Sequence, residues 1–198
     1  MSISLPALPW LATAKPRYVD FAADMTPSLG GPTQRVSRLG SRYAIDVTLP
    51  RMGGDQARAW IGARLKARVL GQTLLLAFPL SDPPGDLLAP VVNAGGQAGA
   101  TLNAKGLRPY VKVLAGSFFS FTVSGRNYLH CVTDDVAADS SGHAALSIAP
   151  LLRNSPADSA VLQFVAPQIE GFLSGVTEDW DLDVLRTVGA TFTLTEVE

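Results

Sequence analysis

Histidine and cysteine side chains could supply nucleophilic or zinc chemistry, and this chain has two histidines and one cysteine. His130 and Cys131 are neighbours in a segment that reads as a β-strand, so their side chains should point to opposite faces. A Cys–His nucleophile pair needs both side chains at one point. His143 follows Gly142 in a turn. Without Cys-x-x-Cys or His-Glu-x-x-His spacing, the sequence predicts neither a thiol nucleophile nor a zinc site.

Other segments carry residue types that active sites use, but not in the required spacing. Asp134–Asp139 does not alternate its acids as a calcium loop does. Gly95–Gly99 is followed by Ala100–Leu102, which reads as a strand, rather than by the lysine and helix start of a phosphate-binding loop. Glu178 and Asp179, beside Trp180, could suggest a glycosidase pair, but neighbouring acids are common in turns. We therefore expect no enzyme activity, no cofactor and no bound metal.

Charged residues are distributed unevenly along the chain. Arg35–Arg68 holds eight bases and two acids, a net charge of +6, whereas Glu170–Glu198 holds seven acids and one base, a net charge of −6. These segments either pair within one subunit or meet between subunits, where complementary potentials set the register. The residues expected at a subunit interface are Arg58, Arg64, Lys66, Arg68, Glu178, Asp179, Asp181 and Asp183.

Length and composition limit the class of protein. A chain of 198 residues has room for one large domain or two small ones. Hydrophobic residues make up 47% and charged residues 17%, which excludes a disordered chain, and the net charge of −1 disfavours general binding to DNA or anionic membranes. The longest apolar run, Leu74–Phe78, is too short to span a membrane, and Met1–Trp10 lacks a basic n-region. We expect a soluble protein made in the cytoplasm.

Hydrophobic periodicity predicts a mainly β fold with one helix. Apolar residues alternate along Tyr43–Leu49, which is typical of a half-buried strand. An apolar repeat every four residues then predicts a helix over about 55–70, with Gly71 as its stop. The turn-rich stretches Leu80–Asp86 and Arg153–Asp158 enclose a block of short strands that suits a small closed barrel.

Short segments spread over much of the chain resemble the distal tail protein of long-tailed bacteriophages. They are Gly95–Leu102, Leu114–Ser120, Tyr128–Thr133, Asp139–Ala144 and Ile148–Arg153. The resemblance implies an outer β-sandwich with one helix, carrying an inserted OB-like β-barrel. With the turn-rich boundaries, this predicts an outer domain of residues 1–82 plus 156–198 and a barrel of residues 83–155.

The resemblance also implies a structural role. Proteins of this family form a ring between the tail tube and the tail tip, so we expect a non-enzymatic virion component that assembles with itself, as a hexamer. The expected partners are the tail tube protein and the tail hub proteins, and the expected location is the virion. No membrane partner and no specific nucleic acid binding are expected.

The alternative is an OB-like binding module for a carbohydrate on the host surface or for single-stranded nucleic acid. Barrels that bind nucleic acid use basic grooves with stacking aromatics. Leu87–Arg153 carries a net charge of only +2. Nucleic acid is therefore disfavoured, and the aromatics Phe118, Phe119, Phe121 and Tyr128 are expected to fill the barrel.

Overall fold

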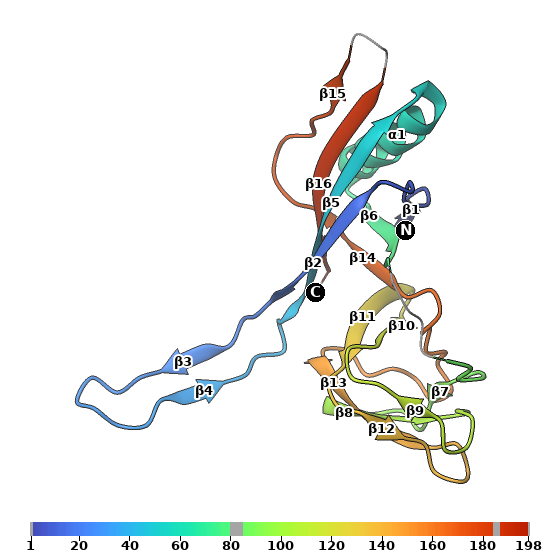
Figure 1. Cartoon of the computed structure of the whole chain (residues 1–198). Coiled ribbons are helices and arrows are strands. Elements are labelled where there is room, and N and C mark those ends of the chain that lie inside the picture. Colours follow the sequence, from blue (N-terminus) through green and yellow to red (C-terminus); the bar gives the residue numbers. More distant parts are fainter. Residues whose placement is uncertain (1, 80–84, 184–186, 198) are drawn as a thin grey trace.

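The structure, a computed structural model, describes residues 2–79, 85–183 and 187–197. These residues form a large sheet covered by a helix, a small barrel and a projecting hairpin (Figure 1). The predicted mainly β fold with one helix and a small barrel is confirmed for the described part of the chain.

The large sheet joins the two ends of the chain. Its strand order is β1-β6-β14-β16-β5-β2, and β15 also pairs with β16. Strands β1 and β6 are parallel, and the other pairs are antiparallel. The strands are β1 (Ser2–Ser4), β2 (Thr13–Val19), β5 (Arg42–Met52), β6 (Thr73–Ala77), β14 (Gln168–Leu173), β15 (Asp181–Leu182) and β16 (Val188–Glu196).

Helix α1 (Gly54–Leu70) packs against the large sheet and confirms the predicted helix. Its N-cap is Gly53, and it ends at Gly71, whose positive φ of 59° suits glycine. The buried side of the helix carries Trp60, whose ring lies 6.0 Å from that of Phe192 in β16. The helix is therefore fixed to the sheet by an aromatic contact.

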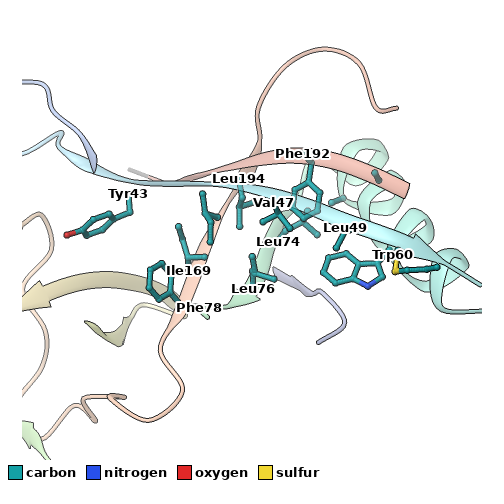
Figure 2. Packing of buried hydrophobic residues seen from close by; sticks show 14 of the residues in the cluster. Tyr43, Val47, Leu49, Trp60, Leu74, Leu76, Phe78, Ile169, Phe192 and Leu194 are labelled. Atoms are coloured by element: carbon teal, nitrogen blue, oxygen red, sulfur yellow. The ribbon is translucent and has the colours of Figure 1, made fainter. Parts of the chain in front are cut away.

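The first apolar core lies between the large sheet, α1 and the barrel. It includes Val47 of β5, Leu74 of β6 and Leu194 of β16 (Figure 2). Leu129 of the barrel strand β11 belongs to the same core, and Phe118 of β10 packs against it. The sheet and the barrel therefore share one set of buried apolar contacts.

The barrel is a five-stranded sheet closed by the chain that returns to the large sheet. The strand order is β10-β11-β13-β8-β7, while β9 and β12 pair separately. Val161 forms a bridge with Val91 of β7, and Gln163 forms one with Ser120 of β10, which joins the two edges. The strands are β7 (Val91–Val92), β8 (Gly99–Lys105), β9 (Lys112–Val113), β10 (Phe118–Val123), β11 (Arg126–Val132), β12 (Val136–Ala137) and β13 (Ala144–Leu152).

This segment, residues 158–164, is called the closing segment here, and it lies beyond the predicted barrel boundary at residue 155. Leu162 and Phe164 are buried in the second apolar core, with the barrel residues Leu102 and Leu146. The structure thus groups the chain as far as Phe164 with the barrel rather than with the outer domain. The physical reason is that an open barrel edge leaves backbone groups unpaired, and this segment pairs them.

The third part of the fold is the arm, residues 20–41. It contains β3 (Ala23–Met25) and β4 (Gln34–Val36), which pair with each other as a separate two-stranded sheet. The arm continues the β2–β5 pair and projects away from both the large sheet and the barrel (Figure 1).

Candidate subunit interface

The root of the arm is held by Asp20. Its carboxylate accepts hydrogen bonds from the Ala22 N–H at 2.9 Å and the Ser41 hydroxyl at 3.0 Å, and it also pairs with Arg35 of β4. The Ala22 N–H is the main cause that lowers the pKa of Asp20. The Arg42 guanidinium lies 5.0 Å from the centre of the Phe21 ring. The arm therefore has a defined direction where it leaves the sheet.

Beyond its root, the arm exposes apolar side chains. Leu29, in the turn between β3 and β4, is 97% exposed. The other large exposed apolar residues of the arm are Phe21, Met25, Val36 and Leu39. A lone two-stranded hairpin is only marginally stable in water. The exposed apolar side chains make the arm the candidate interaction surface of the described residues.

The strap, residues 174–180, connects β14 to β15 and contacts α1. Both strands pair with β16, so the strap leaves the sheet and returns to it. Glu178 pairs with Arg64, and its Oε1 accepts a hydrogen bond from Arg68 Nε at 2.8 Å. The side chains of Arg64 and Glu178 are only 3% and 9% exposed. For these residues the structure shows pairing within one subunit, one of the two alternatives that the sequence left open.

The other predicted interface residues are more exposed. Arg58 pairs with Asp55 one helical turn away, and Asp183 pairs with Arg51 of β5. The three remaining residues have exposed side chains with no described side-chain partner; they are Lys66, Asp179 and Asp181. A role for these residues between subunits stays a prediction.

Two buried carboxylates connect the large sheet to the barrel. Glu196 of β16 accepts backbone N–H bonds from Leu129 at 2.7 Å and Tyr43 at 3.2 Å, and its Oε2 lies 2.6 Å from Arg153 Nη2. Burial raises the pKa of Glu196 despite the nearby Arg153 charge. Glu170 of β14 accepts the Asn127 N–H at 2.9 Å. These oxygens satisfy N–H groups of β11 that face away from β10.

His130 and Cys131 do face different sides of β11, as predicted from their adjacency. His130 is stacked against Phe119 and Phe121, with ring centroids 5.9 and 4.9 Å away, while Cys131 packs against the first core. Burial, followed by the charge of Arg153, lowers the pKa of His130 to about 3. Burial raises the pKa of the Cys131 thiol. His130 is therefore neutral near pH 7, and the thiol is held in its less reactive protonated form.

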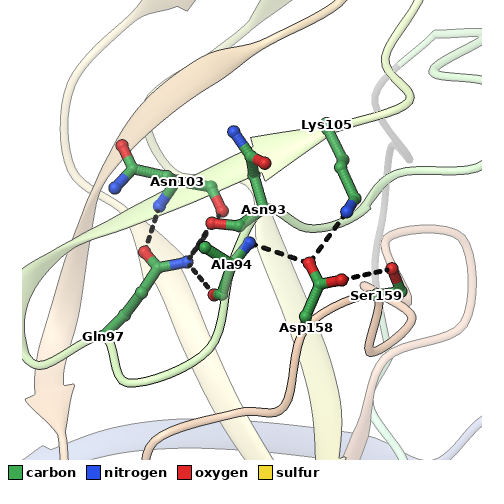
Figure 3. A network of polar contacts seen from close by, with 7 residues as sticks. All are labelled: Asn93, Ala94, Gln97, Asn103, Lys105, Asp158 and Ser159. Carbon is green, nitrogen blue, oxygen red and sulfur yellow. Dashed lines mark hydrogen bonds and ion pairs between the residues drawn. The ribbon is translucent and has the colours of Figure 1, made fainter.

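The glycine-rich loop Gly95–Gly99 is filled by a side chain of its own. Gln97 Nε2 donates to the carbonyls of Asn93 and Ala94 at 2.8 Å each, and the Asn103 N–H donates to Gln97 Oε1 at 2.6 Å (Figure 3). Because these backbone groups bond to Gln97, the loop has the geometry of a braced turn rather than of an anion cradle.

Asp158 holds this loop from the closing segment of the barrel. Its carboxylate accepts bonds from Lys105 Nζ and from the Ala94 N–H, both at 2.8 Å (Figure 3). Lys105 is the main cause that lowers the pKa of Asp158 to about 2. The closing segment is thereby fixed to β8 as well as to β7 and β10.

The acidic turn after β11 has a backbone role. Asp139 accepts the N–H bonds of Ser141 at 2.7 Å and His143 at 2.9 Å, and Asp135 accepts that of Ala115 at 2.8 Å. Over the described residues, no group of three or more His, Cys, Asp or Glu side chains could hold a metal ion. In the same part of the chain, no helix is long and apolar enough to cross a membrane.

The barrel aromatics are placed largely as predicted. Phe119, Phe121 and Tyr128 are buried in the second core, and Phe119 lies 4.9 Å from Phe164. Phe118 faces the other side of β10, where it packs against the first core. These rings are therefore unavailable as an open stacking platform for bases.

Sequence reasoning missed the arm as the strongest candidate for a binding surface. The segments around it carry strand patterns, and Gly30-Gly31-Pro32 marks a turn between them. These signals can identify a hairpin. They do not show whether a third strand pairs with the hairpin, because that depends on where the rest of the chain lies. Among the described strands, β3 and β4 pair with each other alone.

Comparison with known proteins does not assign the chain to a family. No protein-family model matches the chain, and none of the curated proteins compared with it matches either.

Proposed function

We propose that this chain is a structural subunit that assembles with copies of itself into a ring at the tip of a bacteriophage tail. The ring joins the tail tube to the tail tip, and its neighbours are the tube and hub proteins. The resemblance of the barrel segments to distal tail proteins supports this assignment, together with the arrangement of a helix-covered sheet and a closed barrel.

The observation that carries the proposal is the arm. It projects from the body with Met25, Leu29 and Val36 exposed, and among the described strands β3 and β4 pair only with each other. Covering these side chains would remove apolar surface from water, at about 25 cal/mol per Å². A second subunit supplies such a cover, and repetition of a contact between two unlike surfaces gives a ring when the rotation between subunits closes.

The carbohydrate- or nucleic acid-binding alternative receives less support from the barrel. The aromatic rings Phe119, Phe121 and Tyr128 lie in its core, and Gln97 fills the glycine-rich loop. A structural role needs neither an open aromatic platform nor a catalytic group. The proposal therefore uses the exposed arm, which the alternative leaves unexplained.

Particle mass in solution tests the proposed function. We expect light scattering to give a multiple of the 20.9 kDa chain, and electron-microscope class averages to show a ring. Replacing Met25, Leu29 and Val36 together by Ser should shift the protein to a monomer with unchanged circular dichroism, because all three side chains are already exposed.

A matched control separates assembly from general surface polarity. Leu88 and Val161 on the barrel are also exposed, and their replacement by Ser should leave the particle mass unchanged. A wild-type protein that stays monomeric at every concentration would contradict the proposed function. So would an arm variant that assembles as the wild type does.

A further inference from the structure

A pocket lies where the root of the arm meets β13 of the barrel, in the angle between these two parts in Figure 1. Its volume is about 400 Å³, which is within the range of pockets that hold small organic molecules. The arm-root pocket is defined here by Tyr18 of β2, Arg35 and Arg38 of the arm, Tyr43 of β5 and residues 148–151 of β13. Segments that are far apart in the chain therefore meet around one concave site.

The side of the pocket that the arm supplies is positively charged. It carries Arg35, Arg38 and one acid, Asp20, so its net charge is +1. Arg35 is already paired with Asp20. Arg38, by contrast, is exposed and has no partner among the described residues. Since a guanidinium group binds carboxylates and phosphates through paired N–H bonds, Arg38 is available for an anion.

Another wall of the pocket is apolar. It is formed by residues 148–151 of β13, all of which are apolar, together with Tyr18 and Tyr43. The Tyr43 hydroxyl donates to the Ala149 carbonyl at 3.3 Å, which joins β5 to this wall. The Tyr18 ring lies 5.6 Å from the Tyr43 ring, and 47% of Tyr18 is exposed. An apolar group that enters the pocket would therefore contact a fixed surface.

Two hydroxyl groups add hydrogen-bonding capacity. Those of Ser37 and Tyr18 have no hydrogen-bond partner among the described residues, and both side chains line the pocket. A hydroxyl can donate to a carboxylate or phosphate oxygen. The pocket thus combines one available positive charge, two available donors and an apolar wall.

We propose that the arm-root pocket binds a small organic anion. Arg38 binds its carboxylate or phosphate group, and the apolar wall contacts the ring or chain that carries this group. All the residues involved belong to one chain, so binding needs no second subunit. The site is therefore independent of the proposed ring, and its test does not depend on assembly.

Four probe molecules separate the contribution of the charge from that of the apolar body. Phenyl phosphate and benzoate carry both features, inorganic phosphate lacks the body, and benzyl alcohol lacks the charge. Titrations of the full chain followed by ligand-observed NMR give the dissociation constants. We expect phenyl phosphate or benzoate to bind at least about fivefold more tightly than the other two, because one exposed ion pair is worth up to about that factor. Phenyl phosphate against benzoate shows which anionic group the pocket prefers.

Variants locate the binding. Arg38→Ala should raise the dissociation constant of the tighter probe about fivefold. Arg126→Ala is the matched control, since Arg126 is also exposed and without a described partner but lies on the barrel outside the pocket, and it should change nothing. Tyr18→Ala should weaken the probes that carry a ring and leave inorganic phosphate unchanged. Circular dichroism checks that each variant is folded.

Four outcomes overturn the proposal. They are no binding of phenyl phosphate or benzoate, equal binding of inorganic phosphate, which would indicate an adventitious ion only, equal binding of benzyl alcohol, and an Arg38→Ala variant that binds as the wild type does.

Discussion

His130 is a buried base whose surroundings favour its neutral form. The imidazole lies in the interior between the rings of Phe119 and Phe121. Its pKa is about 3 in the folded protein, lowered mainly by burial, against about 6.5 in an unfolded chain. As the pH falls below 6.5, His130 therefore binds a proton in the unfolded state, whereas in the folded state it binds one only near pH 3.

We predict that His130 makes the protein sensitive to acid. Its contribution to the free energy of unfolding should fall by about 1.4 kcal/mol per pH unit from pH 6.5 towards pH 3. The variant His130→Leu, which is similar in volume and cannot titrate, should lack this loss. Urea unfolding of both proteins at several pH values measures the difference. Curves of free energy against pH that stay parallel between the two proteins would contradict the prediction.

Glu196 and Glu170 are buried acids, and Glu196 is the one that pairs with an arginine. It accepts two backbone N–H bonds, from Tyr43 and Leu129, and pairs with Arg153. We predict that Glu196→Ala lowers the free energy of unfolding by about 3–5 kcal/mol, because it leaves the Arg153 charge buried without its partner. Chemical denaturation gives the value.

The double variant Glu196→Leu with Arg153→Leu tests the cause of that loss. It removes both charges and should be less destabilised than the sum of the two single variants. If the loss in the double variant instead equals the sum of the losses in Glu196→Leu and Arg153→Leu, the two side chains do not interact. The loss in the Glu196 variant would then come from its two N–H bonds.

At the scale of elements, the strap is attached to α1 mainly through the Glu178 carboxylate. Glu178 contacts both Arg64 and Arg68, and Arg64 is buried beneath it, with its guanidinium 5.0 Å from the Phe192 ring. Removing Glu178 leaves the Arg64 charge in an apolar site. Of the hydrogen bonds described between the strap and α1, those to backbone carbonyls would then remain, from Arg68 to Ser174 and from Arg64 to Asp179.

We predict that Glu178→Ala lowers the free energy of unfolding by about 3 kcal/mol and speeds amide exchange in residues 174–180. Asp179→Ala is the matched control, since its neighbouring carboxylate is exposed and should change stability by less than about 0.5 kcal/mol. Similar losses in the two variants would show that the Arg64 pair does not hold the strap.

At the scale of the whole molecule, strand β11 belongs to both the barrel and the large sheet. One of its faces supplies Tyr128 and Val132 to the second core, while Leu129 enters the first. Glu170 and Glu196 bind its backbone from the sheet side. The barrel is inserted in sequence between β6 and β14, but these contacts join it to the large sheet.

We therefore predict a single unfolding transition for the whole chain. All three tryptophans lie outside the barrel, and Trp60 and Trp180 contact the first core, so fluorescence reports on the large sheet. Far-ultraviolet circular dichroism reports on both parts. The two denaturation curves should coincide. Two separate midpoints would mean that the barrel unfolds independently of the sheet.

Local patterns in the sequence were sufficient to predict α1 and β5. The apolar repeat and the glycine at position 71 locate α1, because helix periodicity and a left-handed C-cap are local properties. Alternation along Tyr43–Leu49 predicts a strand, and β5 contains it. The adjacency of His130 and Cys131 excludes a common site for the same local reason. The charge asymmetry identified the chain segments that contain the Arg64–Glu178 pair.

Tertiary structure alone decided which of these features meet. Glu178 lies 114 residues from Arg64, and no local pattern says whether they pair within one chain. The closing segment around Leu162 shows no long strand, and only its bridges to Val91 and Ser120 assign it to the barrel. The arm reads as an ordinary hairpin, and its exposure follows from where the sheet ends. Burial and side-chain pairing depend on how the whole chain packs, so the local periodicity of the sequence does not determine them.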